Sequence, residues 1–437
     1  MSPQRLARTL TSTALLMSLW ACSARTDGPV GRRQSPPPPT PIVAAPTPPP
    51  PIEPSPGAGA ATAGGADAIT PRFLEPVVLG RLAVFPVVLS TSAQEDPGPL
   101  MLLDEALEKG LAEVRELGAD PANGAPTPTG NHLDNQDIDL EQRARMPEPL
   151  TNEGQVQRPA HEHEQVQQIQ RHAGGAVVNT LVIENKSDIP IFVPAGTVVR
   201  GGKQDRQIGQ DFVVDAKQTT PVDAFCVERG RWTLEREGKE TGGRFVAVSS
   251  LANAKVRAAG QYKKDQSEVW DNVAQVNKAH SKSAASDTLL ATLEAPDVEA
   301  AIARRSAELG AALRSAARPG ELVGFAWAID GRIQGLRYFA HTRVFDLVET
   351  KLARAVAADL ITAEAEGPGP SDPKAPTIAD LERFVAEVKS AEEVRHDTAA
   401  ANENVYQQSD KAWASKTELK GKAGKKARAL AWDYLAK

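Results

Sequence analysis

Apolar residues alternate with polar ones, or run together in short blocks, along most of the middle of the chain. This pattern is typical of half-buried and fully buried β-strands. The expected strands are 77–90, 176–185, 189–199, 212–215, 222–228, 244–249, 322–329 and 332–336. Asp330 and Gly331 separate the last two strands, and an Asp-Gly pair between strands predicts a two-residue hairpin.

Apolar residues at helical spacing predict helices that flank these strands. The expected helices are 102–117, 297–317 and 344–363. Strands clustered in mid-chain with helices on either side favour an α+β fold over alternating βαβ units. We therefore expect a mainly antiparallel β core, sandwich- or roll-like, with flanking helices.

Composition changes sharply before and inside this α+β domain, which is expected to span residues 72–365. Residues 36–56 contain twelve prolines, and such density favours an extended polyproline II spacer. Residues 22–71 are therefore expected to be a disordered tether. Residues 119–175 are rich in polar residues and proline, which predicts a disordered insertion.

The end of the chain is set apart by a linker rich in glycine and proline at 366–376. Residues 377–437 are then expected to form a separate helical, basic segment. Thr377 and Asp380 resemble a capping box at its start. Basic residues interleaved with tryptophan suit anionic polymers or lipid headgroups, but a solvated helix that packs its aromatic residues on the main domain is the favoured interpretation.

The first residues have the pattern of an export signal. Arg5 and Arg8 precede a mostly apolar run at 10–20, which is too short to span a membrane but suits a signal peptide over 1–21. The following Ala21-Cys22 completes a sequence similar to a bacterial lipobox. We expect lipidation at Cys22 and an exported, membrane-anchored protein facing the periplasm or the cell surface. The alternative is an ordinary cleaved signal with a chance cysteine.

Net charge and cysteine content indicate which partners and which kinds of catalytic site are expected. The 437 residues carry a net charge of −6, and a mildly acidic chain argues against nucleic acid as a partner. Lipidation of Cys22 would leave Cys226 without a disulfide partner. Cys226 is expected to be a buried structural residue rather than a catalytic thiol.

Histidines gather in the expected insertion, where His161 and His163 alternate with two glutamates. A disordered loop is a poor preformed metal site, because stable zinc sites need several positioned ligands. We therefore predict no metal and no cofactor.

Two polar motifs follow predicted strands and contain more charge than a strand needs. They are GGKQDR at 201–206 and ERGRW at 228–232. The spacing from Gly196 to Lys203 does not fit a P-loop, and strand rather than helix is predicted after it. The glycine turn suits an anion-binding nest of backbone N–H groups. The candidate ligand-binding residues are Gly201, Gly202, Lys203, Gln204, Asp205, Arg206, Glu228, Arg231 and Trp232.

Each residue type has a role at such a site. Lys203, Arg206 and Arg231 suit a phosphate or carboxylate group. Gln204, Asp205 and Glu228 suit sugar hydroxyls, and Trp232 suits a base or sugar face. The alternative is a buried ion-pair network that joins the two β-connections, because such networks occur without any function.

These motifs resemble a known family. GGKQDR and FCVERGRW are similar to the ADP-ribosylglycohydrolase (ARG) and Rhodanese-Phosphatase-superfamily-associated Protein domain. LDEALEKG at 103–110, VIENKS at 182–187 and SEVWD at 267–271 support the resemblance, which covers roughly 73–365. The resemblance implies binding of a small anionic or sugar-nucleotide ligand, such as an ADP-ribose-like molecule. A hydrolase acting on such a ligand through Glu228 or Asp205, and an envelope interaction module without a ligand, remain as alternatives.

Overall fold

A nine-stranded sheet joins the two ends of the described chain. The computed structural model describes residues 69–89, 96–117, 180–236, 238–371, 374–421 and 426–437. The predicted signal peptide, nearly all of the tether and the insertion lie outside these ranges. All pairings in the large sheet are antiparallel. Its strands in spatial order are β1 (Pro71–Phe73), β3 (Leu82–Leu89), β15 (Leu322–Ile329), β16 (Arg332–Phe339), β20 (Arg428–Ala436), β19 (Ala412–Leu419), β18 (Asn402–Gln408) and β17 (Val394–Asp397), with β2 (Val77–Leu79) paired to β3.

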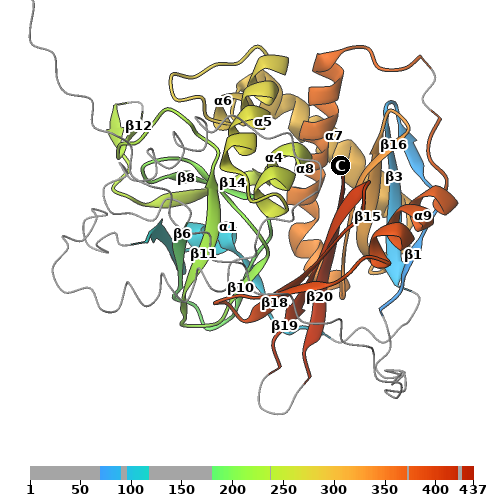
Figure 1. Ribbon diagram of the computed structural model, residues 1–437, viewed down its shortest axis with the longest axis horizontal. Coiled ribbons are helices and arrows are strands. Elements are labelled where there is room, and N and C mark those ends of the chain that lie inside the picture. Colours follow the sequence, from blue (N-terminus) through green and yellow to red (C-terminus); the bar gives the residue numbers. More distant parts are fainter. Residues whose placement is uncertain (1–68, 90–95, 118–179, 237, 372–373, 422–425) are drawn as a thin grey trace, which may run out of the picture. The chain divides into compact units, whose positions relative to one another are not determined.

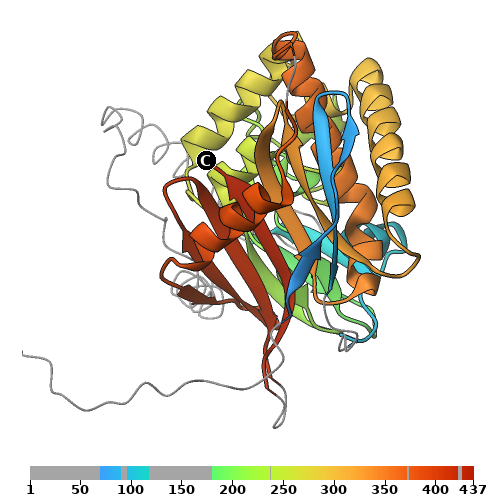
Figure 2. The ribbon, with the colours of Figure 1, turned by 90° about the vertical axis from the view of Figure 1, so that its right-hand side faces the viewer.

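Helices cover both faces of this sheet, which explains why β15 is buried at all eight positions. On one face, α8 (Thr342–Glu366) and α7 (Pro296–Ala316) pack against a core that includes Trp327 and Phe339. On the other face, α9 (Ile378–Lys389) packs against a second core that includes Tyr338. Figure 2 shows α9 lying across the sheet on the side opposite to α7 and α8.

The rest of the β structure belongs to the middle of the sequence. A six-stranded sheet has the order β14 (Phe245–Leu251), β8 (Thr197–Gly201), β9 (Arg206–Ile208), β11 (Thr219–Cys226), β6 (Thr180–Asn185) and β5 (Ala112–Glu116). A three-stranded sheet contains β10 (Phe212–Val214), β7 (Ile191–Val193) and β4 (Met101–Leu102), and a hairpin contains β12 (Glu235–Arg236) and β13 (Lys239–Glu240). The other helices in the described ranges are α1 (Leu103–Glu108), α4 (Ala254–Gln261), α5 (Gln266–Ala279) and α6 (Leu290–Leu293).

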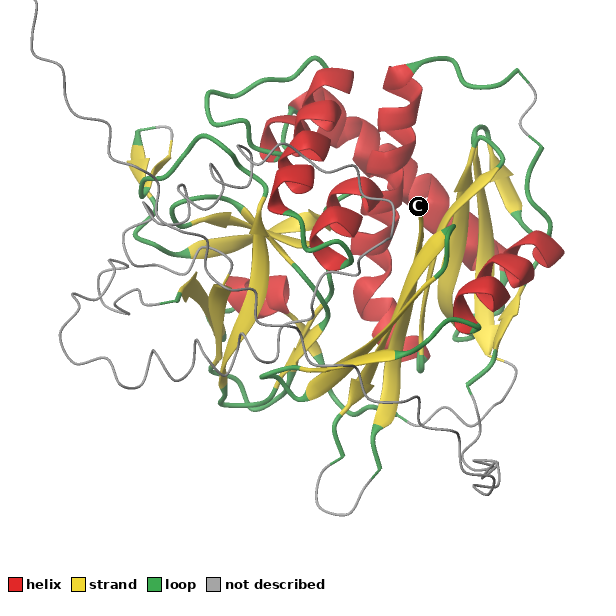
Figure 3. Cartoon of the chain, viewed as in Figure 1, coloured by secondary structure: helices red, strands yellow, loops and turns green. Residues whose placement is uncertain are grey.

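Helices also connect the two β regions, as Figures 1 and 3 show. Apolar residues of β8 and β11 share a core with α4, α5 and α8, while α8 also packs on the large sheet. None of the helices in the described ranges has the length and apolar composition that a membrane crossing requires.

The predicted α+β class with mainly antiparallel strands is confirmed. The hairpin prediction is also confirmed, because Asp330 and Gly331 join β15 to β16 with φ angles of 53° and 75°. Such angles match the turn type that two-residue hairpins prefer. The capping box at Thr377 and Asp380 is present at the start of α9.

Two secondary-structure predictions are wrong. The helix expected over 102–117 ends at Glu108, and residues after Gly110 form β5, because their alternating buried positions pair with β6. The segment 377–437 is not a separate helical tail. After α9 it forms β17 to β20, and β20 pairs with β16 in the centre of the large sheet. This long-range pairing buries Tyr406, Trp413 and Tyr434, which composition does not reveal.

Candidate functional site

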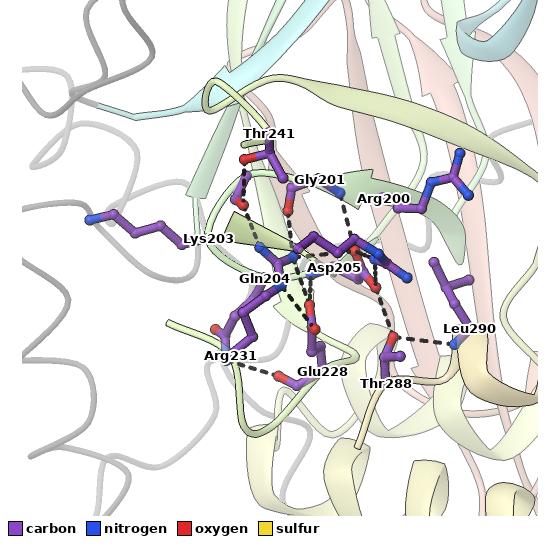
Figure 4. A network of polar contacts seen from close by, with 12 residues as sticks. Arg200, Gly201, Lys203, Gln204, Asp205, Glu228, Arg231, Thr241, Thr288 and Leu290 are labelled. Atoms are coloured by element: carbon purple, nitrogen blue, oxygen red, sulfur yellow. Dashed lines mark hydrogen bonds and ion pairs between the residues drawn. The ribbon is translucent and has the colours of Figure 1, made fainter. Parts of the chain in front are cut away.

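Strand pairing brings the two polar motifs together. Residues 201–206 connect β8 to β9, residues 228–232 follow β11, and β9 pairs with β11 so that Arg206 lies opposite Cys226. The backbone N–H of Asp205 donates to Glu228 Oε2 at 2.8 Å, and Val227 N donates to Asp205 O at 3.0 Å. Figure 4 shows the resulting network.

The glycine pair is required by close packing against neighbouring residues. A Cβ on Gly201 would lie 2.1 Å from the backbone oxygen of Arg244, and one on Gly202 would lie 2.2 Å from Cζ of Phe245. The amide of Gly201 donates to Asp205 Oδ1 at 3.1 Å, and that of Gly202 donates to Arg244 O at 3.0 Å. The N–H groups expected to form an anion nest therefore bind protein atoms.

Arg231 uses all its donors inside this network. Its Nε and Nη2 donate to the two carboxylate oxygens of Glu228 at 3.0 and 2.8 Å. Nη1 donates to the backbone oxygens of Gly202 and Thr233, and Nη2 donates also to that of Gly201. These five hydrogen bonds occupy every N–H of a guanidinium group. Arg231 thus ties the chain after β11 to the glycine turn.

Asp205 is fully buried and surrounded by donors. Its carboxylate accepts from Thr288 Oγ1 at 2.7 Å, and Nη1 of Arg236 contacts both of its oxygens. Burial, together with the negative charge of Glu228, raises the pKa of Asp205 against the opposing effect of Arg236. Arg236 and Thr288 were not predicted as partners, because neither belongs to a motif and only the fold brings them here.

The other motif residues also contact protein atoms. Gln204 Nε2 donates to Glu228 O at 2.9 Å, and Arg206 Nη1 donates to Gln204 Oε1 at 3.1 Å. Arg206 Nη2 lies 3.8 Å from an oxygen of Glu116, which was not predicted as a partner. The Lys203 backbone N–H donates to the same carboxylate, while its side chain points away from the network in Figure 4. Trp232 packs beside Cys226 and Trp270, and its Nε1 donates to Arg229 O at 3.1 Å.

The geometry therefore favours the alternative left open by the sequence, a buried network that joins two β-connections. Asp205 and Glu228 are 0% and 1% exposed, so neither carboxylate is open to a substrate. Binding of a ligand by the two motifs stays a prediction. Cys226 is buried, and burial raises the pKa of its thiol, which disfavours the thiolate that nucleophilic catalysis needs.

Potential metal ligands do not converge in the described ranges. No group of three or more His, Cys, Asp or Glu side chains there is placed to hold an ion. His161 and His163, the histidines considered as metal ligands in the sequence, lie outside the described residues.

A cleft of about 680 Å³ opens elsewhere among the described residues. It lies along α4, beside α5 and α8, near the β15–β16 turn and one end of β19 and β20. Residues of neither motif line it. The charged residues of its lining are Arg81, Lys255, Lys263, Glu268, Asp330, Arg332, Asp359, Glu366 and Lys437, and its other lining residues include Asn253, Ala254, Ala258, Asn272, Gln275, Gln334, Thr362 and Trp413. Small-molecule sites commonly have volumes of about 300–1,000 Å³, so the cleft has a suitable size.

Asp359 is a titratable group of this cleft held at the start of a helix. Its Oδ1 accepts a hydrogen bond from the backbone N–H of Ala254, the first residue of α4, at 3.0 Å. Burial raises the pKa of Asp359 to about 7, although this hydrogen bond and the charges of Arg257 and Lys255 act in the opposite direction. Carboxyl groups with perturbed pKa values in a cleft are candidates for functional residues. No sequence motif marks Asp359, because it is one of several acids in a long amphipathic helix.

Comparison with protein families matches residues 149–428 to the ARG and Rhodanese-Phosphatase-superfamily-associated Protein domain. The chain belongs to this family. The match extends through β17, β18 and β19 to the first residue of β20, so β17, β18 and β19 are part of the family domain. In this member of the ARG and Rhodanese-Phosphatase-superfamily-associated Protein family, both polar motifs and the cleft lie mostly within the matched range. Comparisons with curated proteins and with solved structures give no match.

Proposed function

We propose that this protein is a small-molecule-binding module that works alongside enzymes acting on ADP-ribose or on sulfur and phosphate esters. Its ligand is phosphate-bearing or ADP-ribose-like and occupies the cleft along α4. The observation that carries this proposal is the cleft itself, with its volume of about 680 Å³ and a polar lining of basic and acidic side chains, amides and a tryptophan. The family match supports it, since the family is defined by association with such enzymes.

The lining chemistry favours a polar ligand. Lys255 and Gln275 are exposed beside the cleft, and Trp413 contributes an aromatic ring. A few convergent polar groups around an aromatic surface are typical of sites for small ligands. The two polar motifs stabilise the neighbouring β-connections in this proposal.

We also propose that the protein is exported and anchored by lipid at Cys22, with residues 22–71 as a tether. The proline-rich composition of 36–56 supports a spacer that holds the binding domain away from a membrane. The small-molecule function does not depend on this anchor.

Isothermal titration calorimetry of the full chain with ADP-ribose, ADP and ribose 5-phosphate tests the binding proposal. Gln275→Trp places a bulky ring in the cleft from an exposed position of α5. We expect it to weaken binding at least about tenfold, which corresponds to about 1.4 kcal/mol. The matched control is Ala274→Trp, on the same helix and equally exposed, but absent from the cleft lining. Equal binding by both variants, or no binding of any of the three ligands by the wild type, contradicts the proposal.

A further inference from the structure

The two ends of the cleft differ in chemistry. The cleft follows α4, whose eight residues give it a length of about 12 Å at 1.5 Å per residue. Asp359 lies at the first residue of this helix, and Lys263 lies just beyond its last residue. Ala258, between the two ends, also lines the cleft and adds little bulk. The acidic end, with Asp359, also contains Lys255, and the basic end, with Lys263 and Lys437, also contains Glu268. A ligand that lies along α4 therefore meets the carboxyl group of Asp359 at one end and two ammonium groups at the other.

Two ammonium groups converge on one ring at the basic end. Nζ of Lys263 lies 5.3 Å from the centroid of the Trp413 ring, and Nζ of Lys437 lies 5.1 Å from it. Trp413 is held by stacking on Tyr262, with ring centroids 5.7 Å apart and planes 7° apart. The core therefore fixes the position of this aromatic surface beside the two lysines.

The two positive charges interact unfavourably with each other. Burial lowers the pKa of Lys437, Asp410 opposes this effect, and repulsion from Lys263 adds to it. Lys263 pairs with Glu268 at 2.5 Å, and an ammonium group has further N–H donors beyond one such contact. An anion held between the lysines would relieve their repulsion and accept these hydrogen bonds.

The acidic end has an acceptor for a ligand. Oδ1 of Asp359 is occupied by Ala254 N–H. Among the described residues, no hydrogen bond is made to Oδ2. Asp359 is partly exposed and lines the cleft, so a hydroxyl or amide group of a ligand can donate to it.

We propose that the cleft binds an elongated ligand whose phosphate-class anion lies between Lys263 and Lys437 and whose hydroxyl or amide group donates to Asp359. This inference rests on the proposed function and specifies the ligand as a phosphorylated sugar or nucleotide type. The separation of the two ends, about 12 Å, is more than a single phosphate ion spans. The ligand therefore needs both an anionic part and a neutral part that bears donors.

Two probes separate the two ends in calorimetric titrations of the full chain. Pyrophosphate has only the anionic part, whereas ADP-ribose has both parts. We expect Lys263→Gln and Lys437→Gln each to weaken binding of both probes about ten- to hundredfold. Asp359→Asn retains an oxygen for Ala254 N–H but replaces the other acceptor with a donor. We expect it to weaken ADP-ribose about tenfold and to leave pyrophosphate binding within about twofold.

The matched control is Lys278→Gln, an exposed lysine of α5 that does not line the cleft. If Lys263→Gln binds both probes as Lys278→Gln does, the anionic subsite is wrong. Failure of pyrophosphate to displace bound ADP-ribose contradicts it too. If Asp359→Asn weakens both probes equally, Asp359 does not contact the neutral part. These outcomes leave the proposed function intact, whereas a wild type that binds neither probe nor the other cleft ligands refutes the proposed function itself. Thermal melts show that each variant is folded before it is titrated.

Discussion

Arg231 and Glu228 form a bidentate ion pair in which Nε donates to Oε1 at 3.0 Å and Nη2 donates to Oε2 at 2.8 Å. Both side chains are buried, at 9% and 1% exposure. Glu228 also accepts the backbone N–H of Asp205, so this pair joins the connection after β11 to the connection between β8 and β9. A buried charge whose partner is removed is strongly destabilising, since water cannot replace the partner.

Arg231→Ala is expected to lower the free energy of unfolding by about 3–5 kcal/mol. The change leaves Glu228 buried without its two strongest donors. The control is Arg229→Ala, two residues away, where the exposed guanidinium lies 5.7 Å from the Trp270 ring and a cation–π contact contributes about 0.5–1 kcal/mol. Urea denaturation measures both. An Arg231→Ala variant with wild-type stability but without binding of phosphate-bearing ligands would restore the two motifs as the ligand site.

Gly202→Ala is expected to destabilise the protein by more than about 2 kcal/mol. The φ angle of 47° alone costs a residue with a Cβ about 1–2 kcal/mol, and the added carbon would also meet the Phe245 ring at 2.2 Å. Gly320→Ala separates the two contributions, because Gly320 has a φ of 76° with no atom near its would-be Cβ. Chemical denaturation of the two variants should give the larger loss for Gly202→Ala. Equal losses would mean that the Phe245 ring moves aside without cost.

Asp359→Asn is expected to stabilise the ligand-free protein at pH 8. The pKa of Asp359 is raised from 3.8 to about 7 in the folded protein, so the folded state binds more protons than the unfolded state between these values. The contribution of Asp359 to the free energy of unfolding is therefore fully present below pH 3.8 and is lost as the pH rises through about 7. Asparagine cannot ionise, so the variant escapes this decrease. Each pKa unit corresponds to about 1.4 kcal/mol, enough to shift Tm by several degrees.

Thermal melts of wild type and Asp359→Asn at pH 5, 6, 7 and 8 check this prediction. The positive charges of Arg257 and Lys255 lower the pKa of Asp359 but do not cancel the effect of burial. Asp188→Asn is the control, since the Asp188 side chain is 91% exposed. The gain in Tm should grow from pH 5 to pH 8 only in Asp359→Asn. A pH-independent difference would mean that Asp359 does not titrate in this range.

Cys22→Ser is expected to release the protein from membranes and to abolish incorporation of labelled fatty acid. The prediction depends on the lipobox-like sequence at 19–22, which lies outside the described residues. Cys226→Ser is the matched control, because Cys226 is buried and cannot accept a lipid in the folded protein. Membrane fractionation with fatty-acid labelling gives the answer. Retention of label by Cys22→Ser would exclude lipidation at this cysteine.

Local sequence determined much of the secondary structure. The Asp330-Gly331 turn and the capping box at Thr377 follow from the conformational and hydrogen-bonding preferences of a few adjacent residues, and both were predicted. The strand β15 and the helix α8 were also predicted, because their apolar patterns extend over whole elements. Such features depend on interactions within a few positions of the sequence.

Long-range packing decided the rest. Residues 394–436 contain the β-strands β17 to β20, but their place in the large sheet depends on pairing β20 with β16, about a hundred residues earlier. The basic and aromatic composition of this segment suggested a solvated helix, since sequence alone does not show which strand edge is available. The cleft has the same origin, because its lining extends from Arg81 to Lys437.

The sequence by itself identified GGKQDR and ERGRW as an unusual concentration of charge and predicted the family to which the chain belongs. Whether those charges bind a ligand or one another depends on which donors remain after folding. Only the tertiary structure places Arg236 and Thr288 on Asp205 and occupies every N–H of Arg231. Hydrogen bonds between side chains distant in sequence are set by the packing of whole elements, so no local motif encodes them.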